Sequence, residues 1–326
     1  MVADATNLVT LVQTVDHLPM PAPAQPGRGH PKVYSDRLMM KALVVMIVKR
    51  LPNVHLLLTV LAQPTADMQH LRSLLTENGR FPSRRTWERR LAVVPDTVAG
   101  QIACVGQCLA AMIAPWRDGA SIAAIDSTVV RANGGVWHKK DREANIVPHR
   151  SIDTEAHWTK SGWHGWVYGW KLHLVVSVAS VWIPLAAEVT AANAADNETA
   201  FDLLDELTTA LRYLVGDTAY DDQELREACE DEGITLITSR RGAYPHDDSG
   251  VEVRRVFHAL RSHAIENWNG QFKAIFDVNQ PVPTRGRCAT RRWILGAVLV
   301  YQLTIWCRFE AGEELRAGLK PFIRAA

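Results

Sequence analysis

Three acidic residues stand at positions where a charge adds nothing to solubility. Asp126 interrupts the apolar run 122–130, where a carboxylate is costly unless it is paired, hydrogen-bonded or bound to a metal. Asp217 follows an apolar string that reads as the end of a strand, and ligands of α/β sheets bind at that edge. Glu266 lies in a segment of helical periodicity, seven residues before Lys273, so the two side chains share one face of the predicted helix.

Carboxylates from three separate elements define the chemistry of such a site. Oxygen ligands suit a hard divalent cation, Mg²⁺ or Mn²⁺, rather than zinc. Two such ions, about 3.5 to 4 Å apart, can clamp the attacking and leaving oxygens of an in-line phosphodiester displacement. Each acid also has an ordinary interpretation, as a turn residue, a helix N-cap or a solvated helix residue. The three together, in this order, favour a site.

Periodicity predicts the elements that would position these acids. Residues 35–116 follow a helical pattern throughout, after a proline-rich segment with five prolines in 18–31. Beyond residue 116, short runs rich in branched residues predict five strands, at 122–130, 167–177, 181–190, 211–216 and 234–239. Helices are predicted at 198–210 and 222–232 between the later strands, and a long helix at 253–276. This order predicts an α/β fold with a sheet of mixed direction.

The same pattern divides the chain into four parts. We expect a Pro-rich N-terminal arm at 1–34, with folding from Ser35 onward, and an all-helical DNA-binding domain at 35–116. The catalytic α/β domain would span 117–310, and a C-terminal tail would occupy 311–326.

Composition excludes several classes of protein. Of 326 residues, 47% are hydrophobic and 22% charged, which argues against disorder, collagen and coiled coils. The longest apolar run, 38–48, has about 11 residues where a membrane span needs about 20. We therefore expect no membrane partner and a cytoplasmic protein. The five cysteines form no Cys-x-x-Cys pair, which disfavours a disulfide framework or structural zinc.

The net charge of +1 conceals a segregation of charge along the chain. Residues 117–238 carry a net charge of −10, whereas 1–116 and 239–292 carry +5 each. An acidic middle between basic flanks fits a protein that gathers carboxylates in one part and meets a polyanion with the others. Uneven surface charge alone is the alternative.

Two basic stretches are candidates for contact with that polyanion. The first is a predicted helix with Ser83 as its N-cap, whose arginines include Arg84, Arg85 and Arg89. Preceded by a helix at 68–78, it would be the second helix of a helix-turn-helix. The second stretch, 285–292, contains Arg287 and Arg291 and would run along a DNA backbone. A solvated helix and a solvated loop are the respective alternatives.

The chain resembles the DDE transposases of bacterial insertion sequences. Four strings carry the resemblance, which covers roughly residues 35–307: Ala124-Ile-Asp-Ser-Thr128, Tyr168-Gly-Trp-Lys-Leu-His173, Gly216-Asp-Thr-Ala-Tyr-Asp221 and Glu266-x6-Lys273. The resemblance implies an RNase H-like mixed sheet with flanking helices and a catalytic triad of Asp126, Asp217 and Glu266. It also implies two bound ions, Mg²⁺ or Mn²⁺, and an enzyme that cleaves the ends of its element and joins the 3′-hydroxyl to target DNA. Asp126 would bridge both ions, and Lys273 would hold a phosphate. The partners would be element ends and target DNA, bound by a homodimer.

The sequence departs from the family near the last acid. Relatives often carry a Tyr and an Arg upstream of the Glu, where this chain has Ala259 and Ser262. Arg261 is one position away, a rotation of about 100° on a helix, so we do not expect it to take the place of the missing arginine without a local distortion. We assign it to DNA binding together with Lys273.

Other functions remain open at this stage. A DNA-binding protein without catalysis would bind equally with EDTA or Mg²⁺, and a nuclease of the same fold would cut without joining. A sugar hydrolase with a carboxylate pair is disfavoured by the basic flanks. The Trp- and His-rich segment 137–170 would pack against the sheet edge, with base stacking as its alternative.

Overall fold

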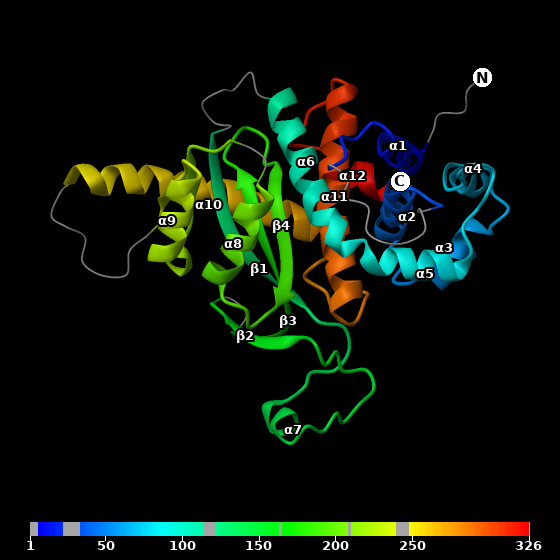
Figure 1. Ribbon diagram of the computed structural model, residues 1–326, viewed down its shortest axis with the longest axis horizontal. Coiled ribbons are helices and arrows are strands. Elements are labelled where there is room, and N and C mark those ends of the chain that lie inside the picture. The colour runs from blue at the N-terminus through cyan, green and yellow to red at the C-terminus, as the bar shows by residue number, and fades with distance from the viewer. Residues whose placement is uncertain are drawn as a thin grey trace.

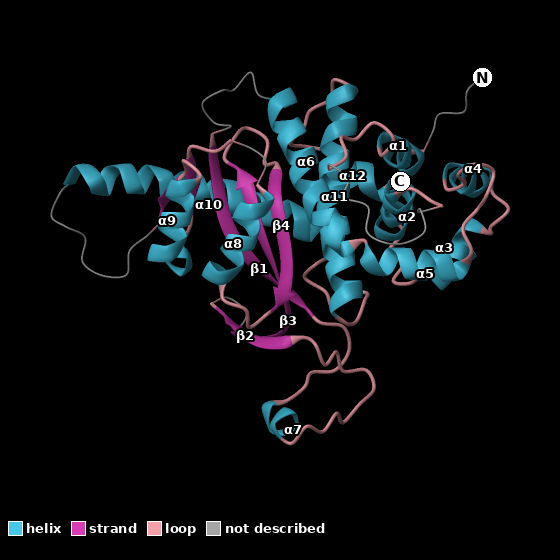
Figure 2. Ribbon diagram, viewed as in Figure 1, coloured by secondary structure: helices cyan, strands magenta, loops and turns pink. Residues whose placement is uncertain are grey.

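A curled mixed sheet stands in the middle of the molecule, with helices on both sides (Figures 1 and 2). The computed structural model describes residues 6–21, 33–113, 121–162, 165–207, 210–238 and 248–325. The predicted α/β class with a mixed sheet is confirmed.

The named elements in the described part of the chain before the sheet are all helices. Its helices are α1 (Asn7–Thr14), α2 (Asp36–Val48), α3 (Val54–Leu61), α4 (Ala66–Leu74), α5 (Arg84–Val93) and α6 (Pro95–Ile113). Polar caps fix where several of them begin: the Ser35 hydroxyl accepts a hydrogen bond from Leu38 N at 3.1 Å, and that of Ser83 from Thr86 N at 3.2 Å. The N-cap predicted at Ser83 is confirmed.

In the described part of the chain, six strands build the sheet. They are β1 (Ile122–Arg131), β2 (His157–Ser161), β3 (Gly165–Ser177), β4 (Pro184–Ala191), β5 (Tyr213–Val215) and β6 (Thr235–Ile237). The order is β2-β3-β1-β5-β6, with β4 also paired to β3. β1, β5 and β6 run parallel, whereas β3 is antiparallel to β1, β2 and β4. Short helical elements follow the strands: α7 (Lys139–Glu143), α8 (Asp196–Glu206), the 3₁₀ turn η1 (Thr218–Tyr220) and α9 (Gln223–Asp231).

Three helices complete the described chain. α10 (Asp248–Phe276) crosses the sheet and contacts β1, β3 and β5. α11 (Arg287–Glu310) is buried over most of its length, between α1 and α2 on one side and α6 and β4 on the other (Figure 1). α12 (Leu319–Arg324) packs on α10 and α11. The helical layer is therefore built from both ends of the chain.

The folded part of the chain begins at an earlier residue and ends at a later one than the sequence predicts. We expected the fold to start at Ser35, but α1 places Leu11 and Val12 in the core at 0% exposure. A helix of eight residues directly before a proline-rich stretch gives too short a pattern to stand out. At the other end, the expected tail at 311–326 contains α12, whose Leu319 and Ile323 are buried. Most of the proline-rich stretch, at 22–32, lies outside the described residues, as does the 114–120 boundary between the expected domains.

The five predicted strands each match an observed strand within a few residues at either end. β2 was not predicted, because its residues, His157 to Ser161, are half-exposed to exposed and show no apolar alternation. The end of the last predicted strand, Ser239, lies outside the described residues.

One described helix, α6, has the length and composition to cross a membrane, over Asp96–Ile113. In the structure 56% of that window is buried, and α6 packs against α11 and β4.

Candidate active site

Two of the predicted acids lie at the same level of neighbouring parallel strands. In the pairing of β1 with β5, Ala124 lies opposite Val215. Asp126 and Asp217 each come two residues further on, so the sheet register aligns them side by side. Asp217 Oδ1 accepts a hydrogen bond from Ala219 N at 2.8 Å, which makes it the N-cap of η1 and fixes its position.

The environment of Asp126 disfavours its charge. Burial raises the pKa of this carboxyl from 3.8 to about 6, and the nearby Asp217 and Asp196 carboxylates act in the same direction. Arg261 and the backbone N–H of Ser127, which donates to Asp126 Oδ1 at 2.8 Å, oppose the shift. A desolvated carboxyl among like charges is typical of a functional site, because fold stability alone does not favour it.

Asp196 was not predicted as a site residue. It begins α8, accepts a hydrogen bond from Lys171 Nζ at 2.9 Å and lies 3.5 Å from Nδ1 of His173. Both partners belong to the Tyr168–His173 string that carries the resemblance, but Asp196 itself has only an ordinary helix-start context. Burial lowers the pKa of the fully buried His173, so its imidazole is neutral at pH 7.

A buried tyrosine hydroxyl lies among these carboxylates. Tyr220 is 1% exposed, and burial together with Asp196, Asp126 and Asp217 raises its pKa well above its usual value. Its hydroxyl has no hydrogen-bond partner among the described residues. A buried hydroxyl without a hydrogen-bond partner costs free energy, which favours a polar ligand near the acids.

Arg261 supplies a positive charge beside Asp126. Its Nη1 lies 3.4 Å from Asp126 Oδ2, and the two side chains are 17% and 26% exposed. The sequence did not predict this ion pair. On α10, Arg261 shares the buried stripe with Ile265, Trp268 and Phe272, so its guanidinium turns inward to the sheet instead of outward.

Glu266 does not join the two aspartates in this structure. Its side chain is exposed, and it is not among the charges that shift the pKa of Asp126. Within the described ranges, no three His, Cys, Asp or Glu side chains are grouped closely enough to hold a metal. Lys273, two turns further along the same face of α10, is nearer: burial lowers its pKa, and Asp126 raises it. Lys273 also lines a cavity of about 200 Å³ with Arg131.

The donor set fits a hard divalent cation in part. Asp126 and Asp217 provide oxygen ligands side by side. The raised pKa of Asp126 shows that positive charge is lacking there, and the Tyr220 hydroxyl has no hydrogen-bond partner among the described residues. Arg261 is the cation that compensates there in this structure.

The predicted basic helix is observed as α5. Arg84, Arg85 and Arg89 are exposed on it, and Arg84 Nε pairs with Glu88 Oε1 at 2.7 Å. The helix-turn-helix interpretation does not fit closely. The nine residues 75–83 separate α4 from α5, where that motif has a turn of three to four. Instead α5 packs on α2, α3, α6 and α11.

Of the two arginines predicted to contact DNA in the second basic stretch, Arg287 is exposed and Arg291 forms ion pairs within the fold. Arg287, the first residue of α11, has an exposed side chain. Arg291 binds Glu188 in a two-pronged pair at 2.8 and 2.7 Å, and its Nη1 contacts Asp96 at 2.8 Å. Arg291 therefore ties β4 to α6 and α11, which we had not expected.

The tryptophan-rich segment packs for the most part. Trp137 is 8% exposed and Trp170 fully buried, and the ring of Trp158 lies 5.3 Å from that of Tyr168. Trp166, by contrast, is 68% exposed on β3. Trp163 and His164 lie outside the described residues.

Comparison with known proteins identifies the family. A model of the family described as "Transposase DDE domain" matches residues 118–285, a span that includes Asp126, Asp217 and Glu266. The chain belongs to this family of DDE transposases. Among solved structures, a piggyBac transposase in a synaptic complex with hairpin DNA, determined by cryo-EM, matches 97% of this chain and 75% of its own, with a TM-score of 0.45 and 8% identity. No curated protein matches the sequence.

Proposed function

We propose that this transposase cleaves DNA at the ends of its own bacterial insertion sequence and joins the exposed 3′-hydroxyl to target DNA. In the first step water attacks a phosphodiester at the element end and the bond to the 3′-oxygen breaks, which leaves a 3′-hydroxyl and a 5′-phosphate. In the second step that hydroxyl attacks a phosphodiester of the target, and the target's own 3′-oxygen leaves. The observation that carries the proposal is the alignment of Asp126 with Asp217 within the DDE domain.

The proposed fold is RNase H-like. Its support is the central β1 with antiparallel β3 on one side and parallel β5 on the other, together with helices after β4 and β5. The first acid would then stand on the first strand of the sheet and the second acid at the end of the parallel neighbour.

Asp126 and Asp217 would hold the divalent ions, two Mg²⁺ or Mn²⁺, with Glu266 as the third ligand. When bound, the ions supply Lewis-acid activation of the phosphodiester and of the attacking oxygen. Two observations support Glu266. It lies on α10 between Arg261 and Lys273, which both interact with the charge of Asp126, and it shares the face of Lys273. Lys273 would bind a phosphate next to the cleaved bond.

The partners proposed for this site are the element ends and the target DNA. Two ends must be brought together for joining, so we propose a homodimer on DNA. The exposed Arg84, Arg85, Arg89 and Arg287 would contact phosphates, and the protein would act in the cytoplasm on the nucleoid.

The test is cleavage of a labelled duplex that carries the flanking ends of the protein's own gene, with Mn²⁺, Mg²⁺ or EDTA. Wild type should nick at the element boundary only with a divalent ion, and Asp126→Asn should bind the duplex but not cut it. Asp202→Asn, an exposed aspartate of α8, is the matched control and should cut normally. Cleavage by Asp126→Asn would contradict the proposal.

A catalytically inactive DNA-binding protein derived from such an element is the second candidate. The observation that favours it is the exposed Glu266, which stands apart from Asp126 and Asp217. Specific binding of the ends with no cutting in Mn²⁺ or Mg²⁺ would select it.

A further inference from the structure

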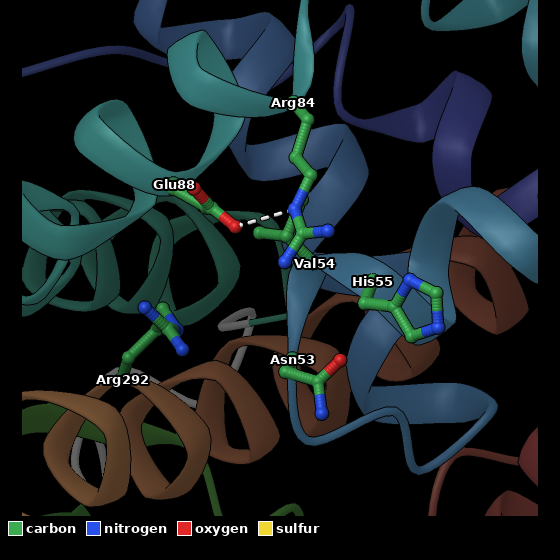
Figure 3. Close-up of a pocket in the computed structure, with 6 residues that line it drawn as sticks. All are labelled: Asn53, Val54, His55, Arg84, Glu88 and Arg292. Atoms are coloured by element: carbon green, nitrogen blue, oxygen red, sulfur yellow. Dashed lines mark hydrogen bonds and ion pairs between the residues drawn. The ribbon is translucent and has the colours of Figure 1, made fainter.

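The cavity between α3, α5 and α11 has no role in the chemistry described above. It has a volume of about 470 Å³ and is lined by Asn53, Val54, His55, Arg84, Glu88 and Arg292. Figure 3 shows Arg84 turned towards Glu88, with His55 and Asn53 from the start of α3 on one side and Arg292 from α11 on the other. Pockets for small organic ligands are mostly apolar, whereas two guanidiniums and an imidazole meet here.

Arg292 is the unusual member of this cavity. Its Nη1 donates to the Leu91 carbonyl at 3.0 Å, and no carboxylate of the described residues is among the groups that shift its pKa. Burial lowers its pKa. A half-buried cation without a counter-ion is costly, and a bound anion would remove that cost.

The other cavity residues favour an anion as well. Arg84 is 60% exposed, and the ion pair that it forms among the described residues is with Glu88 on the same helix. Asn53 caps α3 by accepting from Leu56 N at 3.0 Å, so the positive end of this helix opens on the cavity. Glu88 is the single acidic group, and its carboxylate competes with an incoming anion for Arg84.

We propose that this cavity binds one backbone phosphate of the element-end DNA, held by Arg84 and Arg292. The inference rests on the proposed function, because it needs DNA as the partner. Arg85 and Arg89 lie exposed on the same helix as Arg84, so a duplex seated at the cavity meets further cations. The guanidinium fork suits a phosphate through paired hydrogen bonds.

The test measures affinity of the purified protein for its element-end duplex across a series of salt concentrations. Arg84→Gln and Arg292→Gln should each weaken binding about tenfold or more and lower the salt slope by about 0.9, the value for one phosphate. Arg292→Lys keeps the charge and covers the case that Arg292→Gln fails to fold. Glu88→Gln should act in the opposite direction and tighten binding about two- to fivefold. Lys320→Gln, an exposed cation on α12 remote in sequence from the cavity, is the control for loss of one charge.

A duplex with single neutral methylphosphonates then locates the contact. Wild type should lose affinity at each contacted phosphate, and at one of these positions the Arg84 and Arg292 variants should show no further loss. Losses that add independently at every position would overturn the inference. Inorganic phosphate alone separates the two sources of the anion: if it stabilises the wild type to heat while the variants bind DNA normally, the cavity is a site for free phosphate and the inference is wrong. If wild type does not bind the ends at all, the proposed function fails, and this inference with it.

Discussion

At the scale of single residues, Asp126 stands out because its surroundings in the folded protein disfavour the ionised form of its carboxyl group. Its pKa rises from 3.8 to about 6, so the folded protein binds a proton more tightly there than the unfolded chain does. The contribution of this carboxyl to stability is therefore greatest below pH 4, falls as the pH rises to about 6, and stays low above that. Active-site groups commonly lower the stability of the folded protein in this way.

Asp126→Asn removes the charge and should be more stable than wild type at pH 8, by about 3 kcal/mol at most, since the side chain is partly exposed. At pH 4 the two proteins should be equally stable. Urea unfolding in EDTA at both pH values measures the difference, with Asp202→Asn as control. A gain that is the same at pH 4 and pH 8 would show that the ionised carboxylate is not its source.

Arg261 offsets the charge of Asp126 across a distance of 3.4 Å. Arg261→Gln should destabilise the protein at pH 8 by about 1 to 3 kcal/mol, because Asp126 then keeps its charge without a cation. The loss should disappear at pH 4, where Asp126 is protonated. Urea unfolding measures both, and Arg261→Lys should restore much of the loss. Mn²⁺ should raise the melting temperature of Arg261→Gln more than that of wild type, and an equal rise would contradict the role of Arg261 as a substitute cation.

At the scale of elements, α1 is the feature whose importance the sequence least indicates. Leu11 is fully buried, and α1 contacts α2, α4 and α11. Leu11→Ala should lower the free energy of unfolding by about 2 to 5 kcal/mol, since it leaves a cavity in a packed core. Gln13→Ala, on the exposed side of the same helix, should change it little. Equal, small effects in denaturant unfolding would mean that α1 is dispensable.

Elements with a strong local pattern were predictable, and those defined by distant contacts were not. β1 and α10 follow from branched runs and from a helical apolar stripe. β2 forms because β3 offers it an edge, and its own residues carry no signal. In the site, the adjacency of Asp126 and Asp217 depends on the register of β1 with β5, in which Ala124 lies opposite Val215. The Arg261 pair depends on how α10 is rotated about its axis, which no local pattern fixes.

At the scale of the whole molecule, α11 joins the helices to the sheet. Gln302, fully buried on α11, donates from Nε2 to the carbonyls of Ile102 in α6 and Pro184 in β4, each at 2.8 Å. Gly106 allows α6 to approach β4 this closely, since a Cβ there would lie 2.4 Å from the Pro184 oxygen. The division into a helical domain at 35–116 and a catalytic domain at 117–310 stays a prediction, and this packing argues for a single cooperative unit.

Hydrogen exchange in increasing urea distinguishes one unit from two. Peptides from α2 and from β3 should lose protection at the same urea concentration, because α11 and α6 contact both the helices and the sheet. Gln302→Leu removes the side-chain donor to two buried carbonyls and should move both transitions down together, by about 1 to 3 kcal/mol. Gln69→Leu, exposed on α4, should move neither. If Gln302→Leu shifted only one of the two, the helices and the sheet would be separate domains, and the catalytic domain could then be studied alone.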